Sequence, residues 1–446
     1  MAIPLVLLTL TLFIAIFVLV QMDLVDRGLA MLGGAVAFLL LGWMFDFYLI
    51  EEAIQAIYFD SLALLFGMSL ISNALFRSGI FHSLAFRAVR YSGGNSLLIV
   101  TLLILITYSV SLVFNNLSVM VIMLPLTLVL CQSLQMAAAP IVAAELIASN
   151  LGGASTLVGD FPNMIIGSVA RLHFDDFIGG MMVPCLILLA ATLLYFQNRI
   201  TRLSSAPLDL EVIRTALMAL SPNQRAEKNA LTVDSYLLRV GSWVFVLTLL
   251  GFFLAKPLGI KAAAFSFVAG CVVLALGRVP KQEWFEAISG GDLLFFLGLF
   301  VMVGGLQAVG VLELLRNLID TLGGGHATLS LLVLMWLAGL VTPLFNAGPT
   351  TALLIPVAQS MSIQISGDAI WWALSLGVLA GSSASLSGAT AGPVVASFMA
   401  KHARQLPKAQ RSSATVLDFH GYLHWGVPMA FVFLVISSVY IMMIAS

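Results

Sequence analysis

The chain is dominated by long runs of apolar residues, separated by short segments that hold most of the charged residues. A helix that crosses a bilayer needs about 20 mostly apolar residues. Runs of this kind, some of them interrupted, occupy residues 3–20, 28–44, 54–76, 97–113, 117–131, 137–170, 179–197, 236–254, 260–277, 292–309, 329–344, 350–363, 370–400 and 425–445. Membrane barrels use short strands of alternating hydropathy, so the pattern predicts an all-α membrane protein.

Several sequence features recur at an interval of 231 residues. Four of them match without a gap: Gly79 with Gly310, Phe114-Asn115 with Phe345-Asn346, Pro125 with Pro356, and Pro162 with Pro393. Self-similarity at one fixed interval indicates an internal duplication. We therefore expect a first repeat over residues 1–197, a cytoplasmic linker over 198–235 and a second repeat over 236–446.

Two segments of each half do not suit a plain crossing. The joint from Phe114 to Leu117 is too short and too polar to separate two full crossings, which predicts a re-entrant hairpin. The run 137–170 contains Gly and Pro at a density that breaks a helix. Unwound backbone at this depth must line a cavity or be buried in protein. Residues 343–349 and 381–393 are the counterparts, so each repeat is predicted to contain five transmembrane helices, a re-entrant hairpin and a broken helix.

The number of crossings sets the orientation of the two halves. Because five is an odd number, we expect the second repeat to be inverted relative to the first. With the loops after the first, third and sixth elements of each half on one side, sixteen Lys and Arg residues share that side and four lie opposite: Arg171, Lys256, Lys261 and Arg316. The basic side is expected to be cytoplasmic. This predicts two inverted-topology repeats in a bacterial inner membrane, with both termini outside.

The composition narrows the class of function. Apolar residues make up 61% of the chain and charged residues 9%, against roughly 25% in a soluble domain. These values exclude an ordinary soluble enzyme and a disordered protein, and the net charge of −1 offers no basic surface for nucleic acid. No GxxxxGK[ST], HExxH or GxSxG motif occurs. We therefore expect no enzymatic activity, catalytic residue, cofactor or resident metal.

Inverted repeats with paired broken helices are typical of secondary transporters, whose site lies near the bilayer midplane. Helix ends, amides and hydroxyls at such a site can bind ions. The predicted substrate- or ion-binding residues are Asn115, Asn116, Ser118, Ser149, Asn150, Gly153, Ser155 and Thr156 in the first half, and Asn346, Thr350, Thr351, Ser382, Ser383, Ser385, Ser387 and Thr390 in the second. Alternatively, such hydroxyl groups fasten membrane helices to one another.

Four carboxylates lie within the apolar runs or near their ends. Asp160 lies in the first predicted break and is the main candidate for proton coupling, because carboxylates inside a membrane are costly and usually functional. Glu145 precedes Ser149 by one helical turn. It either carries a proton as well or hydrogen-bonds a neighbouring helix. Asp60 and Asp292 lie near predicted helix starts, which favours helix capping.

The segment AELIASNLGGASTLVGDFPNMIIGS, residues 144–168, closely resembles the signature of the ion transporter superfamily. The similarity is to the branch of arsenical pumps, sodium/proton antiporters and P-protein permeases, which is related to divalent anion:sodium symporters. Residues 62–81 and 293–313 resemble the same branch, and the similarity spans nearly the whole chain. The resemblance implies a scaffold from the first three helices of each half. It also implies a mobile unit of hairpin, broken helix and last helix that moves as an elevator, often in a homodimer.

The second half departs from the pattern of this branch. Relatives commonly carry Asp-Asn at each hairpin tip, whereas the tips here are Asn115-Asn116 and Asn346-Ala347. Relatives also often have Gly-Gly-Asn in the second broken helix, where this chain has Gly381-Ser382-Ser383. The loss of carboxylate and amide ligands argues against a sodium site in the second half. Asp160 is then the main acidic group of the predicted site.

The main hypothesis is a proton-coupled secondary transporter that expels arsenite, antimonite or a similar small inorganic solute. A sodium/proton antiporter and a sodium-coupled di- or tricarboxylate carrier are the alternatives. From a different class, the chain could be a channel or the membrane subunit of an ATP-driven pump. The candidate partners are the lipid bilayer, the solute, a proton or sodium ion, a second copy of the chain and a soluble ATPase subunit.

Overall fold

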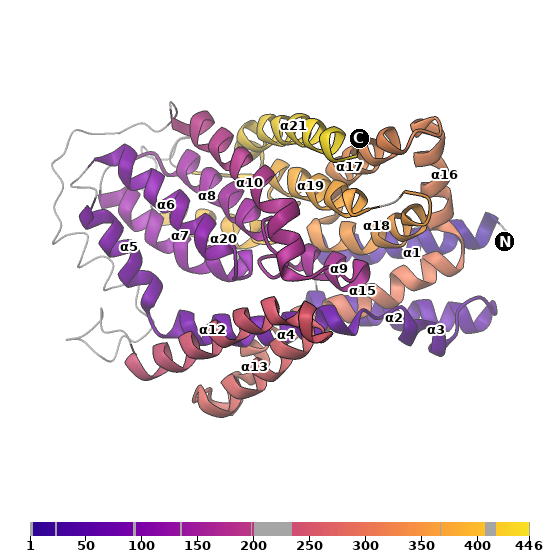
Figure 1. The fold of residues 1–446 in the computed structure, drawn as a ribbon, viewed down its shortest axis with the longest axis horizontal. Helices are drawn as coiled ribbons and strands as arrows, with labels where there is room; N and C mark the ends of the chain where they lie inside the picture. The colour runs from indigo at the N-terminus through magenta and orange to yellow at the C-terminus, as the bar shows by residue number, and fades with distance from the viewer. Residues whose placement is uncertain are drawn as a thin grey trace.

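The computed structural model describes residues 3–22, 25–91, 95–133, 136–197, 199, 234–365, 367–405 and 416–445, and the bundle they form is helical (Figure 1). The predicted linker over 198–235 lies almost wholly outside the described residues. The first-half helices are α1 (Ile3–Gln21), α2 (Arg27–Met44), α3 (Ile50–Gln55), α4 (Phe59–Arg77), α5 (Ile80–Tyr91), α6 (Ser96–Ser111), α7 (Asn116–Ser133), α8 (Ala138–Ala154), α9 (Phe161–Ala170) and α10 (Phe174–Gln197).

The second half begins with α12 (Ser235–Leu258). It continues with α13 (Ala262–Leu276), the 3-10 turn η1 (Lys281–Glu283), α14 (Trp284–Ala287), α15 (Gly290–Ala308), α16 (Val311–Gly323), α17 (Ala327–Phe345), α18 (Ala347–Ser362), α19 (Ala369–Ala384), α20 (Gly392–Gln405) and α21 (Phe419–Ile444).

Eight of the described helices are long and apolar enough to cross a bilayer: α1, α2, α4, α10, α12, α15, α17 and α21. Further apolar helices, among them α6, α8, α13 and α19, are shorter. Large apolar side chains project from the bundle, such as Trp43 (74% exposed) and Leu194 (68% exposed), as expected of a surface that faces lipid rather than water. The predicted class of an all-helical membrane protein is confirmed.

The 231-residue interval recurs in the positions of the helices. Six helices of the second half, α15 to α20, each begin 231 residues after a helix of the first half, α4 to α9 respectively. The turns before α5 and α16 share a left-handed backbone, with φ of +79° at Gly79 and +88° at Gly310. Glycine adopts this conformation at little cost because it has no Cβ.

The packing of the helices follows the same interval. α2 packs along α15 and α4 along α13, and in each half the later helix contacts both helices of the preceding pair: α8 contacts α6 and α7, and α19 contacts α17 and α18. The last helix of each half, α10 or α21, packs on the same broken helix. α4 and α13 approach so closely that a Cβ on Gly67 would lie 1.9 Å from the Ser266 carbonyl oxygen. Small residues allow membrane helices to pack at this distance.

Two features differ from the sequence-based expectations. α5 and α16 were not predicted, because their apolar residues form a stripe on one face rather than a continuous run. Asp60 and Asp292 lie in the first turns of α4 and α15 but do not cap them. Asp60 accepts from Lys261 Nζ at 2.6 Å, and Asp292 pairs with Arg27 at 2.6 Å. These carboxylates therefore form ion pairs with residues of other helices instead of accepting hydrogen bonds from the backbone N–H groups of α4 and α15.

Candidate functional site

Two helices are interrupted where the sequence predicts a break. Residues 155–160, termed break 1, separate α8 from α9, and residues 385–391, termed break 2, separate α19 from α20. Break 1 is entirely buried and break 2 nearly so. Pro162 lies in the first turn of α9, where a backbone N–H would have no helical partner, so proline is well suited to restart the helix.

Asp160 closes break 1 and begins α9 as its N-cap. Its Oδ1 accepts a hydrogen bond from the Phe161 N–H at 2.9 Å, and its Oδ2 accepts from Asn116 Nδ2 at 3.1 Å. Both side chains are buried, and no Lys, Arg or His forms an ion pair with Asp160 in the described part of the chain. A buried carboxylate without a counter-charge is costly unless it binds a proton or a cation. The Asp160 carboxyl group is therefore suited to binding a proton or a cation and to changing its charge when it does.

Several oxygen atoms near the breaks have no hydrogen-bond partner in the described residues. They are Asn116 Oδ1, Thr350 Oγ1 and Thr390 Oγ1, each out of contact with solvent. The Thr390 side chain is a neighbour of the Asp160 carboxyl group. Gly153 leaves room for Asn116, because a Cβ on Gly153 would lie 2.6 Å from Asn116 Oδ1. Unpaired buried oxygens of this kind can accept a hydrogen bond or ligate a cation.

A cavity of about 10 Å³ lies at Asp160 between the two halves. Its walls are formed by Asn150, Ala154, Asp160, Pro162, Asn163, Ser375, Val378, Leu379 and Ser382. A volume of about 10–15 Å³ on this scale holds one water molecule. In this conformation the site can therefore hold a particle the size of water but not a molecule with several heavy atoms. None of the lining residues is basic.

The two halves meet at this cavity through two asparagines. Asn150 Nδ2 donates to the Ser382 carbonyl at 3.1 Å, and Asn163 Oδ1 accepts from Ser375 Oγ at 2.7 Å. Asn163 Nδ2 also donates to the carbonyls of Ala154 and Thr156, at 2.9 and 2.8 Å. Asn163 thus holds the unwound backbone of break 1.

Asn163 was not among the predicted site residues. It follows Asp160 by three positions, which places the two residues on neighbouring faces of one helical turn. This spacing was the available signal. Because it does not identify the carbonyls that the amide reaches across break 1, the role of Asn163 follows only from the structure.

Asn346 holds the backbone of break 2, as Asn163 holds that of break 1. It lies at the tip between α17 and α18, and its Nδ2 donates to the carbonyls of Ser387 and Ala389 at 3.0 and 3.1 Å. Ser385 accepts from the Gly388 N–H at 2.9 Å, and its hydroxyl contacts the Pro343 carbonyl at 3.3 Å. The side-chain amide of Asn346, which was predicted to bind substrate or ion, therefore donates to backbone carbonyls instead.

Other predicted residues of the first half join α6 to α8 and break 1. Ser149 accepts from Ser111 Oγ at 3.1 Å, Ser155 and the Tyr108 hydroxyl are 3.0 Å apart, and the Thr156 hydroxyl donates to the Leu112 carbonyl. These contacts make α6, break 1 and α8 one connected unit.

The remaining predicted residues make local contacts. Asn115 accepts from the Leu117 N–H at 3.0 Å and caps α7. Thr351, Ser382 and Ser383 donate to carbonyls three or four residues earlier in their own helices, at 2.8, 2.9 and 3.0 Å. Ser118 is half-buried on α7 and has no side-chain hydrogen bond to the described residues. The alternative that hydroxyl groups stabilise helices therefore describes part of the predicted set.

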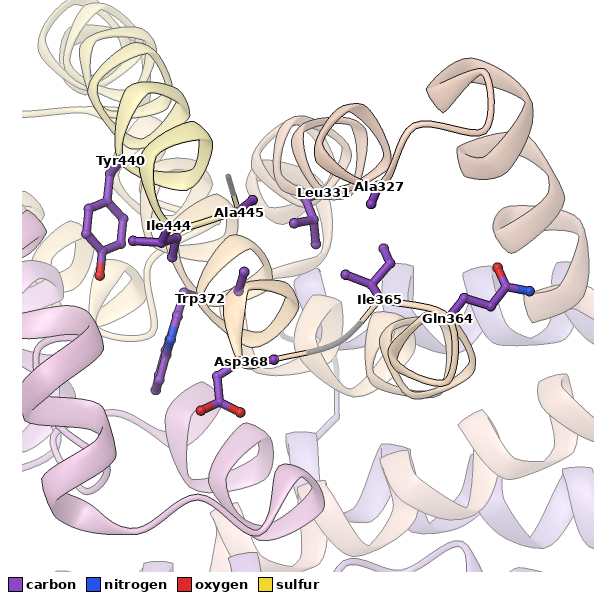
Figure 2. Close-up of a pocket in the computed structure, with 11 residues that line it drawn as sticks. Ala327, Leu331, Gln364, Ile365, Asp368, Trp372, Tyr440, Ile444 and Ala445 are labelled. Carbon is purple, nitrogen blue, oxygen red and sulfur yellow. The ribbon is translucent and has the colours of Figure 1, made fainter.

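A larger cavity of about 460 Å³ lies apart from the breaks, between the first turns of α17 and α19 and the end of α21 (Figure 2). Among the described residues that line it, Asp368 is the charged one, and Trp372 and Tyr440 form part of the wall. None of the predicted site residues lines it. Its position at the ends of helices separates it from the interrupted backbone and the Asp160–Asn116 pair.

An apolar helical bundle with two interrupted helices around a buried carboxyl group is the architecture of a membrane transporter. The sequence model of the family described as CitMHS, citrate transporter, matches residues 14–377. The chain belongs to this family, which lies within the ion transporter superfamily, and the resemblance seen in the sequence is confirmed.

Named relatives agree with this assignment. The chain is 41% identical over 441 residues to the magnetosome protein MamN of Magnetospirillum gryphiswaldense, covering 98% of this chain and 99% of MamN. It is 27% identical over 461 residues to the human P protein, covering 87% of this chain and 55% of that protein. The crystal structure of the Alcanivorax borkumensis YdaH transporter is similar in fold, with a TM-score of 0.55, 15% identity, and coverage of 86% of this chain and 84% of YdaH.

Proposed function

We propose that this chain is a secondary transporter that exchanges a small inorganic solute or ion against protons, with Asp160 carrying the proton. The observation that carries the proposal is the buried Asp160–Asn116 pair at 3.1 Å. A proton neutralises the carboxylate. When the proton leaves, a cation can take its place beside the negative charge, or a polar solute can hydrogen-bond to the carboxylate. Competition between proton and solute for one group would couple their movements in opposite directions.

The size and charge of the cavity at Asp160 support a small solute. Its volume of about 10 Å³ suits a particle of water size. With no basic lining residue, it offers no countercharge to a polyanion, and the Asp160 carboxylate would repel one. A sodium ion fits this volume, whereas arsenite and antimonite have several heavy atoms and require the cavity to widen. Their hydroxyl groups can hydrogen-bond the Asp160 carboxyl group once it has done so.

Inverted repeats over residues 1–197 and 236–446 are part of the proposal. Six helix starts recur at the 231-residue interval, which supports a duplication. The equivalent helices α5 and α16 lie at opposite ends of the bundle in Figure 1, as an inverted copy requires. The hydrogen bond from Asn150 to Ser382 joins α8 and α19 near the C-terminal end of each. In this arrangement the α6–α7 and α17–α18 pairs are re-entrant hairpins, and both termini face outside.

An elevator motion follows from the same arrangement. The mobile unit would comprise the hairpins, broken helices and last helices, and the scaffold would comprise α1, α2, α4, α12, α13 and α15. Apolar contacts join the two parts at the site, where the rings of Phe161 and Phe296 stack with centroids 3.4 Å apart. Ser61 donates to the Met164 carbonyl at 3.3 Å across the same interface. A mostly apolar interface allows sliding without leaving many polar groups unpaired.

Citrate transport is the second candidate function, and the family description favours it. Citrate is larger than the cavity at Asp160, so this function requires the two halves to separate around the site. Neutralisation of citrate by a bound cation would reduce its repulsion from Asp160.

The purified protein in liposomes under a pH gradient distinguishes these candidates. Arsenite, antimonite, sodium and citrate are each supplied alone, and proton movement is followed with an enclosed pH dye. We expect proton movement with an inorganic solute and no response to citrate. A response to citrate alone would overturn the choice of substrate class. Uphill movement without ATP would exclude a channel and show that a soluble ATPase subunit is not required.

A further inference from the structure

Glu145 is a second buried carboxyl group, located on α8 about three turns before break 1. The side chain is fully buried, and its Oε1 accepts a hydrogen bond from Thr127 Oγ1 of α7 at 2.8 Å. Its Oε2 has no hydrogen-bond partner in the described residues, and the same is true of Thr107 Oγ1 on α6. The Thr107 side chain is a hydrogen-bonding neighbour of the Glu145 carboxyl group. Two oxygens that lack a hydrogen bond to the described residues therefore belong to neighbouring buried side chains.

In the described part of the chain, no basic residue forms an ion pair with Glu145. The ion pairs of the described residues do not include it. Of the helices that pack against α8, α7 contributes the Cys131 thiol and the Thr127 hydroxyl, and α6 contributes the Thr107 hydroxyl. An ionised carboxylate in this place would be buried without a counter-charge, which is strongly unfavourable.

A single proton on Glu145 would give both unpaired oxygens a hydrogen-bond partner. With hydrogen on Oε2, Glu145 donates to Thr107 of α6 while it continues to accept from Thr127 of α7. We infer that Glu145 is a carboxylic acid that keeps its proton throughout the transport cycle and fastens α8 to both helices of the α6–α7 pair. It is a positioning residue, which distinguishes it from Asp160.

The second half shows that this place in the fold accepts a neutral side chain. At the 231-residue interval, the three positions are occupied by buried apolar residues: Thr107 corresponds to Ala338, Thr127 to Ala358 and Glu145 to Leu376. A protonated glutamic acid is similar to leucine in size and carries no charge. The three equivalent positions are therefore filled by uncharged, hydrogen-bonded side chains in the first half and by apolar side chains in the second.

Infrared difference spectroscopy of wild type against Glu145→Gln tests the protonation state directly. We expect the difference to contain the carbonyl band of a protonated carboxylic acid, unchanged from about pH 6 to about pH 9, where a glutamate in water is ionised. Asp160→Asn, the control, should leave this band in place. A carboxylate band at any pH in this range would overturn the inference. This readout requires no transport, so it is independent of the proposed function.

Variants test the positioning role. Glu145→Gln can donate to Thr107 and accept from Thr127, so we expect wild-type thermal stability and an unchanged pH profile of transport. The triple variant Thr107→Ala, Thr127→Ala, Glu145→Leu copies the second half and should behave in the same way. Glu145→Ala should lower Tm by several degrees because it leaves a cavity and an unpaired hydroxyl. Loss of proton movement in both Glu145→Gln and the triple variant would instead make Glu145 a proton carrier.

Discussion

Asn150 and Ser382 are separated by 232 residues, yet the Asn150 amide donates to the Ser382 backbone carbonyl at 3.1 Å. The same amide lies 3.5 Å from the Ser383 hydroxyl. Because these residues lie near the ends of α8 and α19, the bond joins the two halves where their helices are interrupted. The site is thus built from both halves, although its carboxyl group comes only from the first.

Removal of this link should destabilise the bundle. Asn150→Ala leaves a buried carbonyl unpaired, which costs about 1–3 kcal/mol. We expect a lower melting temperature in detergent, measured by intrinsic fluorescence. The matched control is Asn317→Ala, because Asn317 is exposed on α16. Equal stability of the two variants would show that the Asn150 bond contributes nothing to the junction.

Gly153 should be intolerant of any side chain. A Cβ at this position would lie 2.6 Å from Asn116 Oδ1 and 2.9 Å from Asp160 Cβ, closer than ordinary contacts allow. Gly153→Ala should therefore displace Asn116 from Asp160 and reduce transport at least tenfold. Gly179→Ala provides the control, since no atom lies within 4 Å of its Cβ and alanine favours a helix over glycine. Wild-type flux in Gly153→Ala would contradict the assigned geometry.

Asn163 should govern the shape of break 1. Asn163→Ala removes donors to the carbonyls of Ala154 and Thr156 and the acceptor of Ser375. Asn163→Asp keeps the size and the acceptor but removes the donors. We expect both variants to lose stability, by about 1–3 kcal/mol for the buried groups left unpaired. If the aspartate variant alone retained wild-type stability and transport, the bonds to the break would be unimportant.

Asn346 should be needed for break 2 but not for proton coupling. Asn346→Ala unpairs the carbonyls of Ser387 and Ala389 and should lower Tm by an amount similar to Asn163→Ala. Because no carboxyl group lies in break 2, the ratio of protons to solute should remain unchanged. A changed ratio, measured by parallel pH and solute assays, would place a coupling group in the second half.

The sequence predicts the class of fold because apolar runs and clusters of Gly and Pro are local signals. Both breaks occur where those clusters lie. α5 and α16 are not predicted from these signals, because an amphipathic helix at a surface has no continuous apolar run. The positions of the helix starts also follow the 231-residue interval that the sequence contains.

The partners of individual polar residues could not be predicted. The sequence singles out Asn116 and Asn346 alike, as amides beside predicted hairpin tips. In the structure Asn116 contacts a carboxyl group, whereas Asn346 contacts backbone carbonyls of break 2. The two residues are not equivalent in the repeat, because Asn346 corresponds to Asn115 and Asn116 to Ala347, and the counterpart of Asp160 at the same interval is Ala391. Which carbonyls an amide reaches depends on contacts between distant segments, which a single sequence does not specify.

Proton movement in liposomes containing wild type or Asp160→Asn is the most direct test of the account. With an imposed pH gradient and arsenite, antimonite or sodium supplied singly, wild type should move protons only when one of these solutes is present. Asp160→Asn keeps the size of the side chain and its contact with Asn116 but cannot exchange a proton. It should retain the wild-type melting temperature and lose solute-dependent proton movement. Proton movement at the wild-type rate in Asp160→Asn would contradict the assignment of Asp160 as the proton carrier.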